Sequence, residues 1–267
     1  SQGPSTLCKY QPDEIIPGLN IGGWHDAGDY DLRVESQAGE AYILAMAYEN
    51  LGAYWDETTI DFENRIVEIH QPDGKNDFLQ QVENGALTVV AGWKALGRLY
   101  RGIICPTVRQ YVHLGDGSAH TDNISGTADD RWVFTEDNPN RELQVAAWLA
   151  GISRVLKGYN DSLSEECLNI SRELYNITRS NNERELIAKI HAAVELYLST
   201  QKVEYRDFVL SQQEFICENI VQTGWLIGRF DIAVNNTPFS EALSLSIASI
   251  ALSMSFPISG SLALPCK

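Results

Sequence analysis

Apolar side chains recur along most of this chain at intervals of three and four residues. Between Phe78 and Tyr100, for example, apolar positions follow one another in steps of four, four, three, four, three and four. This spacing gathers the apolar side chains on one face of an α-helix, whereas a half-buried strand would alternate with a period of two. The pattern predicts an all-α protein with helices at residues 36–52, 77–100, 140–157, 162–180, 183–200, 203–221 and 240–255.

The links between several of these helices are short. Residues 159–162 and 180–183 join consecutive helical patterns, and short links favour antiparallel neighbours. Ser162 or Asp161 is a suitable N-cap for the helix that follows, with Glu165 and Glu166 in its first turn. Because no linker, low-complexity tract or repeat divides the chain, we expect residues 1–267 to form a single domain.

Residues 101–140 interrupt the helical order. This stretch is rich in Gly, Asp, Thr and aromatic residues, which supply polar groups and ring faces. Loops of this length inside compact domains are uncommon and are usually functional or disordered. We therefore expect a functional loop here, with a flexible insertion as the alternative.

Charge and cysteine content narrow the class of partner. The formal net charge is −16 and the pI is near 4.6, so phosphate-rich nucleic acid and anionic membrane surfaces would be repelled, and a neutral or cationic ligand is favoured. No apolar run approaches the length of a membrane span. The five cysteines form no Cys-x-x-Cys pair, which argues against a zinc site, and Cys167 falls on the apolar face of a predicted helix.

The segment from Gly22 to Tyr30 carries the chemistry most plainly. It reads Gly-Gly-Trp-His-Asp-Ala-Gly-Asp-Tyr, with Asp26 and Asp29 three residues apart. Glycines permit backbone angles that other residues avoid, and Asp favours turns, so the segment predicts a tight loop that aims both carboxylates at one point. There they could hold a water molecule, and Trp24 offers a flat apolar face for a sugar ring. The alternative is a turn whose aspartates bond their own backbone.

A second candidate constellation runs from His113 to Asn123. It contains a Gly115-Asp116-Gly117 turn and ends near His120, whose ring nitrogens could bond sugar hydroxyls. A solvent-facing loop histidine is the alternative. Calcium ligation is a further, weaker alternative for the carboxylates of this region, because calcium takes several oxygen donors but no twelve-residue calcium loop is present. Those carboxylates are Asp122, Asp129 and Asp130.

The Gly22–Tyr30 segment resembles the first catalytic motif of glycoside hydrolase family 9, whose members are mostly cellulases. The turn before His120 is similar to the family segment that leads into a substrate-contacting histidine. Residues 129–134 resemble a version found in the bacterial branch, whose catalytic domain follows an N-terminal immunoglobulin-like domain. Residues 79–87 and 192–198 look like barrel helices of that branch.

The resemblance implies an (α/α)6 toroid, which has twelve helices. Only about seven are predicted here, so the match covers the front portion of the family's catalytic domain. By this likeness Asp29 would be the general base of an inverting endo-β-1,4-glucanase, and Asp26 would help to orient the water. Trp24, His25 and His120 would contact substrate, although His25 stands where many members have Tyr. No cofactor is implied, and the protein would be secreted, periplasmic or at the surface of a bacterial cell.

Two later family motifs, a histidine-arginine segment and the segment that supplies the general acid, have no counterpart in the sequence. Inverting enzymes need that acid on the far side of the scissile bond, about 6.5–9.5 Å from the base. Two hypotheses follow. The chain is the front part of a glucanase whose barrel is completed by a further segment or a second chain, or it is a non-catalytic glycan-binding or inactive remnant module.

Overall fold

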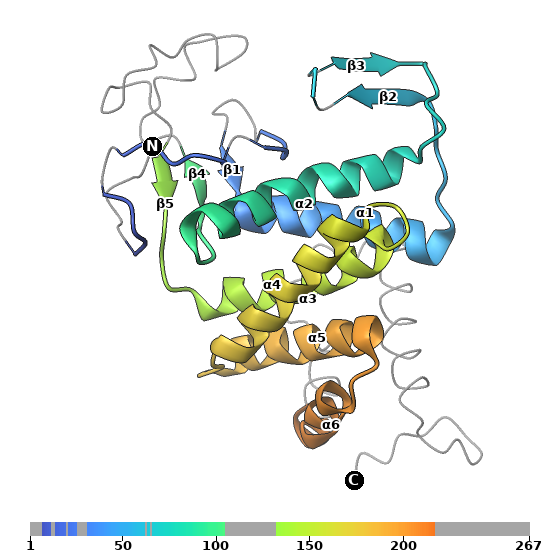
Figure 1. Ribbon diagram of the computed structural model, residues 1–267. Coiled ribbons are helices and arrows are strands. Elements are labelled where there is room, and N and C mark those ends of the chain that lie inside the picture. The colour runs from blue at the N-terminus through green and yellow to red at the C-terminus, as the bar shows by residue number, and fades with distance from the viewer. Residues whose placement is uncertain are drawn as a thin grey trace, which may run out of the picture.

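The computed structural model describes residues 7–11, 14–19, 21–25, 31–61, 63–64, 66–104 and 132–216. Its secondary structure is dominated by helices (Figure 1). The helices within these residues are α1 (Val34–Leu51), α2 (Asp77–Leu96), α3 (Pro139–Leu156), α4 (Asp161–Ile177), α5 (Glu183–Thr200) and α6 (Val203–Ser211). The strands are β1 (Leu32–Arg33), β2 (Thr58–Asp61), β3 (Ile66–Ile69), β4 (Gly102–Ile104) and β5 (Trp132–Phe134).

The helices form three consecutive hairpins in two layers. Helix α3 packs along both α1 and α5, which gives one layer, and α2 packs against α4 in the other. Within each hairpin the members contact each other: α1 with α2, α3 with α4, and α5 with α6 (Figure 1). This alternation between layers is the arrangement of an (α/α)6 toroid, present here in part. The all-α class and the partial toroid predicted from the sequence are confirmed.

The predicted helix positions agree closely with the structure for the first five helices. The sixth, α6, ends at Ser211 and is followed by helical residues 213–216, while 217–221 of its predicted range and the predicted helix at 240–255 lie outside the described residues. The predicted N-cap of α4 was wrong. Asn160 is the cap, and its side chain accepts a hydrogen bond from the backbone N–H of Leu163 at 3.1 Å. Asp161 instead accepts from the backbone N–H of Gly158, which closes the preceding turn.

Two small antiparallel sheets accompany the helices, and the sequence pattern did not reveal them. One has the strand order β1-β4-β5, so the two ends of the predicted 101–140 loop pair with each other and with the segment before α1. The other is the β2–β3 hairpin, whose second strand is exposed throughout. Strands of two to four residues are too short to show a period of two.

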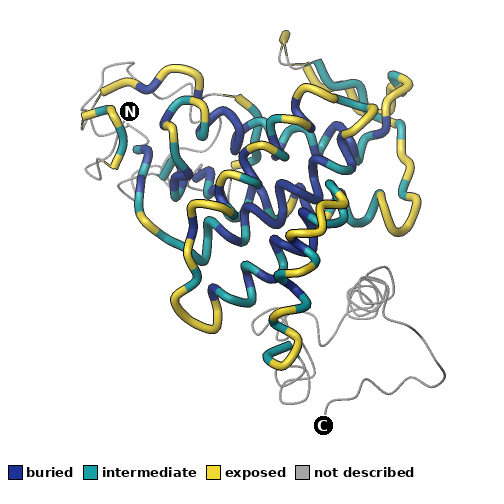
Figure 2. Tube along the Cα trace, turned by 60° about the horizontal axis from the view of Figure 1, so that its bottom comes forward, coloured by how far each residue is buried: buried dark blue, intermediate teal, exposed yellow. Residues whose placement is uncertain are grey.

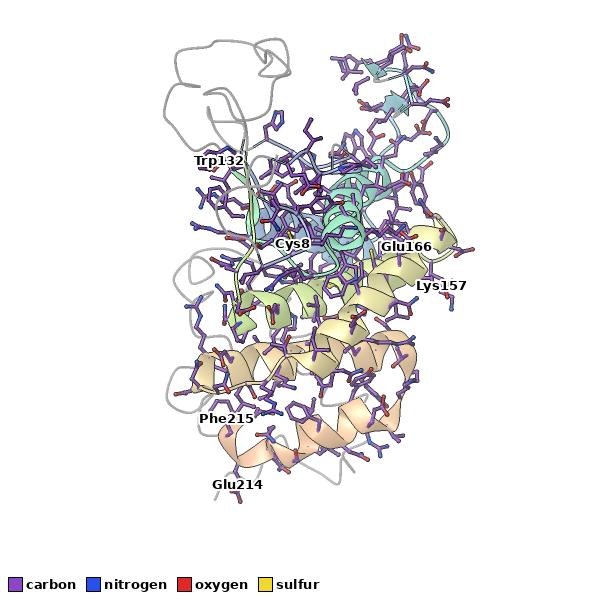
Figure 3. All side chains as sticks on the ribbon, turned by 60° about the vertical axis from the view of Figure 1, so that its left-hand side comes forward. Cys8, Trp132, Lys157, Glu166, Glu214 and Phe215 are labelled. Atoms are coloured by element: carbon purple, nitrogen blue, oxygen red, sulfur yellow. The ribbon has the colours of Figure 1, made fainter. Side chains whose placement is uncertain are left out.

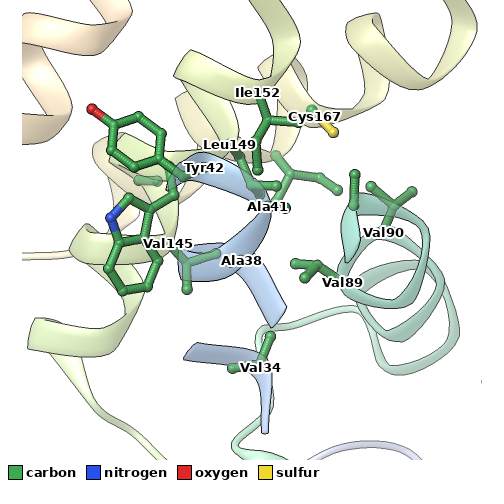
Figure 4. Packing of buried hydrophobic residues seen from close by; sticks show 14 of the residues in the cluster. Val34, Ala38, Ala41, Tyr42, Val89, Val90, Val145, Leu149, Ile152 and Cys167 are labelled. Atoms are coloured by element: carbon green, nitrogen blue, oxygen red, sulfur yellow. The ribbon is translucent and has the colours of Figure 1, made fainter. Parts of the chain in front are cut away.

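The main core lies between α1, α2, α3 and α4. Figure 4 shows Ala38 and Ala41 of α1 facing Val89 and Val90 of α2, with Leu149 and Ile152 of α3 beside them. Buried positions run along the facing sides of these helices, and exposure is concentrated in the connections (Figure 2). Cys167 belongs to this core and is fully buried, as the apolar pattern predicted; burial raises the pKa of its thiol well above the usual value.

Aromatic rings fit against glycines of α2 and α3. A Cβ atom on Gly92 would lie 2.0 Å from the Tyr100 ring, and one on Gly151 would lie 2.6 Å from the Tyr42 ring. Both distances are far inside van der Waals contact, so only glycine allows these close approaches. Trp148 of α3 is also buried in the core.

A largely buried network of charged and polar side chains, with Glu49 at its exposed end, joins the three helices of one layer. Tyr42 of α1 donates a hydrogen bond to Glu195 of α5 at 2.8 Å, and Arg154 of α3 donates to the other oxygen of Glu195 at 2.9 Å. Arg154 also makes a bidentate pair with Glu49 of α1, at 2.6 and 2.7 Å. His191 of α5 lies 3.3 Å from the Tyr42 hydroxyl. We call these five side chains the charged network.

Burial and charge shift the protonation equilibria in this network. Burial, together with the neighbouring Glu195 carboxylate, raises the pKa of Tyr42 well above its ordinary value. Burial lowers the pKa of His191, and the proximity of Glu195 opposes that shift. Desolvation would lower the pKa of Arg154, but its bonds to Glu49 and Glu195 outweigh that effect and raise it. Tyr42 and Arg154 therefore keep their protons at neutral pH.

Candidate active site

The segment that enters the predicted aspartate loop is fixed between α1 and α2. Gly22 and Gly23 have φ angles of +63° and +84°, in the left-handed region that favours glycine. They are also enclosed. A Cβ atom on Gly22 would lie 2.4 Å from the carbonyl oxygen of Asn84, and one on Gly23 would lie 2.9 Å from Oε1 of Gln37. The glycines of the motif thus serve both the turn and its close approach to the helices.

Trp24 is held by both its backbone and its side chain. Its backbone N–H donates to Oε1 of Gln37 at 2.7 Å, and its carbonyl accepts from Nε2 of the same residue at 2.8 Å. Its indole Nε1–H donates to Oε1 of Gln81 at 2.9 Å. The ring lies over Gly85 of α2, where a Cβ atom would be 2.6 Å from Cζ3. Trp24 is consequently half-buried and anchored on one edge.

Gly23 is bonded to α2 in the same way. Its backbone N–H donates to the carbonyl of Asn84 at 2.8 Å, and its own carbonyl accepts from Nδ2 of Asn84 at 3.2 Å. We call Gln37, Gln81 and Asn84 the amide clamp. Together they bond the backbone of two consecutive residues and the indole of the second, all with uncharged groups.

The chain is fixed again just beyond the loop. Asp31 is 2% exposed and pairs with Arg33 at 3.2 Å. Leu32 and Arg33 form β1 against β4, and the N–H of Val34 donates to the carbonyl of Arg101. Residues 26–30 therefore connect two anchored points of the fold, one on the amide clamp and one on the β1-β4-β5 sheet.

The predicted site residues divide into two groups. Trp24 lies on the amide clamp, and His25 is exposed next to it. Asp26, Asp29 and His120 lie outside the described residues, as do Asp122, Asp129 and Asp130 of the calcium alternative. The catalytic and substrate-binding roles of all these residues stay predictions. One edge of the Trp24 ring packs against Gly85, so Trp24 has a packing role in addition to its predicted role in contacting substrate.

Ion pairs near the β1-β4-β5 sheet tie the surrounding helix ends together. Arg141 in the first turn of α3 bonds both oxygens of Glu35 in the first turn of α1, at 2.9 and 3.3 Å, and also pairs with Glu136. Arg98, after α2, donates to the carbonyl of Glu136 and to Asp137. Glu136 thus has a bonding role between the ends of these helices. Figure 3 shows Trp132 of β5 on this side of the molecule, away from Glu166 of α4.

The sequence analysis missed the amide clamp. A weak signal was present, because Gln81 and Asn84 are polar residues that interrupt the apolar helix between Leu79 and Leu87. Gln37 similarly stands directly before the buried Ala38 in the first part of α1. A polar amide adjoining a buried stripe needs partners, and a glycine-rich loop with unpaired backbone groups can supply them.

Neither a metal-binding cluster nor a membrane-spanning helix occurs in the part of the chain that the structure describes. Among the described residues, no three His, Cys, Asp or Glu side chains gather in the way a metal site requires. Within the same part of the chain, no helix has both the length and the apolar character needed to cross a membrane.

The layered helical hairpins and the glycine-bracketed loop beside them define a toroid-type helical protein. A family model described as Glycosyl hydrolase family 9 matches residues 18–234, which is most of the 267-residue chain. The chain therefore belongs to glycosyl hydrolase family 9.

Solved structures agree on the fold. A metagenome-derived family 9 endoglucanase superposes with a TM-score of 0.55 at 20% identity, over 78% of this chain and 38% of that one. A family 9 protein from Bacteroides ovatus superposes with a TM-score of 0.55 at 18% identity, over 79% and 40%. This chain thus spans about two fifths of the length of either structure. No curated protein matches the chain.

Proposed function

We propose that this chain contributes the general-base side of an inverting glycoside hydrolase that acts on β-1,4-linked glucans. Family membership over residues 18–234 supports a glycoside hydrolase, and the endoglucanase among the similar structures supports a β-glucan substrate. The observation that carries the proposal is the anchoring of the motif: Trp24, two residues before Asp26, is bonded through its backbone and indole to two helices.

In this mechanism Asp29 accepts a proton from a water molecule as that water attacks the anomeric carbon, and Asp26 helps to orient the water. Two neighbouring carboxylates raise each other's pKa, which brings a base closer to its working pH. Trp24, His25 and His120 would contact the sugar. A general acid on the other side of the scissile bond protonates the leaving oxygen. Neither a metal nor a cofactor takes part.

We further propose that residues 1–267 are one domain, the front portion of such a catalytic domain. The described residues contain three helical hairpins, and a six-hairpin toroid needs three more. The general acid and the rest of the barrel would then come from a further segment or a second chain. Extracellular, periplasmic or cell-surface action follows from a polymeric substrate that cannot enter a cell. The bacterial branch with its immunoglobulin-like domain stays a prediction.

The decisive test replaces Asp29 by Asn in the protein at its natural full length. Turnover of a soluble cellulose derivative should fall at least about a hundredfold, as expected for loss of a general base. Asp61→Asn, on the exposed β2–β3 hairpin, is the matched control and should change little. Product analysis by NMR should show inverted anomeric configuration. Near-normal turnover in the Asp29 variant would remove the assignment.

The same preparation also tests the second hypothesis, in which the chain is a non-catalytic glycan-binding or inactive remnant module. Calorimetric titration with cello-oligosaccharides measures binding without turnover. If the unsubstituted protein binds these sugars but never hydrolyses them, the module is a non-catalytic glycan binder or an inactive remnant.

A further inference from the structure

Gln37 makes an unusual pair of bonds for a side chain inside a helical core. It is 3% exposed, near the start of α1, and both ends of its amide bond the backbone of the same residue, Trp24. This is the bonding that a neighbouring β-strand would offer, supplied by one side chain. The carboxamide of Gln carries a donor and an acceptor in one planar group that stays uncharged at any physiological pH.

A packing role alone does not account for Gln37. Burying an amide is unfavourable unless its hydrogen bonds are satisfied, so an apolar side chain of similar volume would serve packing better. The surrounding positions of α1, Val34, Ala38 and Ala41, are all apolar and fully buried. The one polar side chain in this stripe is therefore retained for what it bonds, the backbone at Trp24.

The other members of the amide clamp act on the same short segment. Asn84 bonds the carbonyl of Gly23, and Gln81 bonds the indole of Trp24. These bonds approach from α2, whereas Gln37 approaches from α1. The backbone of Gly23 and Trp24 is thus fixed from two helices that already pack on each other, and its position is as rigid as that helix pair.

We propose that Gln37 is a positioning residue for the predicted general-base loop, acting through the backbone of Trp24. The proposal rests on the proposed function, since Asp26 and Asp29 follow Trp24 by two and five residues. A displacement of about 1 Å at a reacting group can reduce a rate about a hundredfold, so the entry point of this loop matters for catalysis. An uncharged amide fixes the backbone without adding a charge that would shift the pKa of the nearby base.

The test compares Gln37→Leu with Gln80→Leu in the protein at its natural full length. Gln80 is a matched control because it is 1% exposed, lies on α2, and donates to Asp73 at 3.0 Å. Hydrogen exchange of the peptide covering Gly22–His25 is measured first. Gln37→Leu should speed exchange at the Trp24 amide at least about tenfold, because its acceptor is gone, and Gln80→Leu should leave that amide unchanged.

Kinetics on a soluble cellulose derivative give the second measurement. Gln37→Leu should lower kcat and kcat/KM equally, by about tenfold or more, the pattern for a lost transition-state arrangement. Gln80→Leu should stay within about twofold of the unsubstituted protein. Assays well below the unfolding temperature of each variant keep the comparison among folded molecules.

A third variant, Gln37→Glu, gives a signature that general destabilisation would not. Protonated Glu can accept from the Trp24 N–H and donate to the Trp24 carbonyl, whereas ionised Glu can only accept. The ratio of its kcat to that of the unsubstituted protein should therefore rise as pH falls, while the ratio for Gln37→Leu stays flat. Titration of the general base cancels in the ratio for Gln37→Leu. In Gln37→Glu the ionised carboxylate would also raise the pKa of that base, which lowers kcat at higher pH and acts in the same direction as the lost hydrogen bond.

Outcomes for the two proposals are separable. If Asp29→Asn abolishes turnover but Gln37→Leu matches Gln80→Leu in both exchange and kcat, Gln37 is a packing residue and the positioning proposal is wrong. If Asp29→Asn keeps its turnover, the proposed function is wrong. If the Trp24 amide exchanges at the same rate in Gln37→Leu and Gln80→Leu, Gln37 does not fix the Trp24 backbone and the positioning proposal is wrong.

Discussion

The amide clamp and the charged network both consist of polar side chains, but they hold different parts of the fold in place. The clamp uses three uncharged amides, and what they hold is backbone and one indole. The charged network uses two carboxylates and an arginine, and what they hold is one helix against another, α1 and α5 against α3. Neutral groups thus hold the entry to the predicted aspartate loop, and the charged network lies within a helix layer.

The difference follows from electrostatics. A buried charge acts over several ångströms and shifts the pKa of its neighbours, as Glu195 does for Tyr42. Next to a catalytic carboxylate such a charge would alter the base itself. An amide bonds at short range and has no net charge, so it can define geometry without setting a pKa. The predictions below test this contrast, from the largest effect to the smallest.

The largest effect is expected in the charged network. Glu195→Leu removes the carboxylate that bonds both Tyr42 and Arg154 and leaves a mostly buried guanidinium with Glu49 as its one charged partner, besides the hydroxyl of Ser199. The free energy of unfolding should fall by about 3 kcal/mol, the lower end of the range for broken buried pairs. Urea denaturation measures it. Glu166→Gln, in a more exposed pair with Lys94, should cost no more than about 1 kcal/mol. Equal losses in both variants would show that the charged network contributes no more to the free energy of unfolding than an exposed ion pair does.

The next effect concerns the surface on which the clamp holds Trp24. Gly85→Ala places a methyl group inside the Trp24 ring and should cost about 2 kcal/mol through overpacking. Gly39→Ala is the matched control, because its new methyl would lie 3.6 Å from the Trp148 ring, an ordinary contact. That variant should be stabilised by up to about 1 kcal/mol through better helix propensity. Thermal unfolding should show a lower unfolding temperature for Gly85→Ala and a higher one for Gly39→Ala. A change in the same direction in both variants would contradict the close fit of the Trp24 ring against Gly85.

A single amide cap gives the scale for one uncharged bond to backbone. Asn160→Ala should lower the free energy of unfolding by about 1–2 kcal/mol, because it removes the N-cap of α4 and a bond to Glu83. Ser162→Ala should change it by less than about 0.5 kcal/mol, since Ser162 is an exposed residue beyond the cap. Denaturant midpoints measured side by side would decide between the two positions. A larger loss at Ser162 would restore it as the cap.

The smallest effect is a slope against pH. Burial lowers the pKa of His191 below its ordinary value of 6.5, although Glu195 opposes the shift. As pH falls below about 6.5 the unfolded chain takes up this proton more readily than the folded one, so stability present at higher pH is lost. His191→Gln should remove that loss, and each pKa unit of lowering corresponds to about 1.4 kcal/mol. Between pH 5 and 8, the unsubstituted protein should lose stability relative to His191→Gln as pH falls. Parallel curves would mean that the histidine titrates alike in both states.

The helices could be predicted from the sequence because each buries a continuous apolar stripe. The stripe from Phe78 to Tyr100 gave α2 to within a few residues of its ends, and the short link at 159–162 gave the α3–α4 hairpin. The N-cap of α4 could not be chosen in the same way, because Asn160, Asp161 and Ser162 are all suitable caps in sequence. Geometry selects Asn160, since Asp161 is engaged by Gly158.

The candidate site was predicted only as far as a local motif allows. Gly22 and Gly23 were assigned to a tight turn, and their positive φ angles agree. The partners of that turn, Gln37 and Asn84, are 14 and 61 residues beyond Gly23, and no local pattern links residues so far apart. Hydrogen bonds from a side chain to backbone also produce no repeating apolar pattern in the sequence. The amide clamp is therefore visible only in the three-dimensional structure.

The fit of rings against glycines has a consequence for how this family can change. At Gly92 and Gly151 a methyl group and the neighbouring tyrosine ring cannot occupy the same space. A lineage could therefore acquire alanine at either position only after Tyr100 or Tyr42 had been replaced by a smaller residue, and the reverse order would pass through a poorly folded ancestor. For Tyr42 the first step would also release Glu195 from its hydrogen bond. The order of substitutions, and not only their sum, is thus constrained by two contacts between a backbone and a ring.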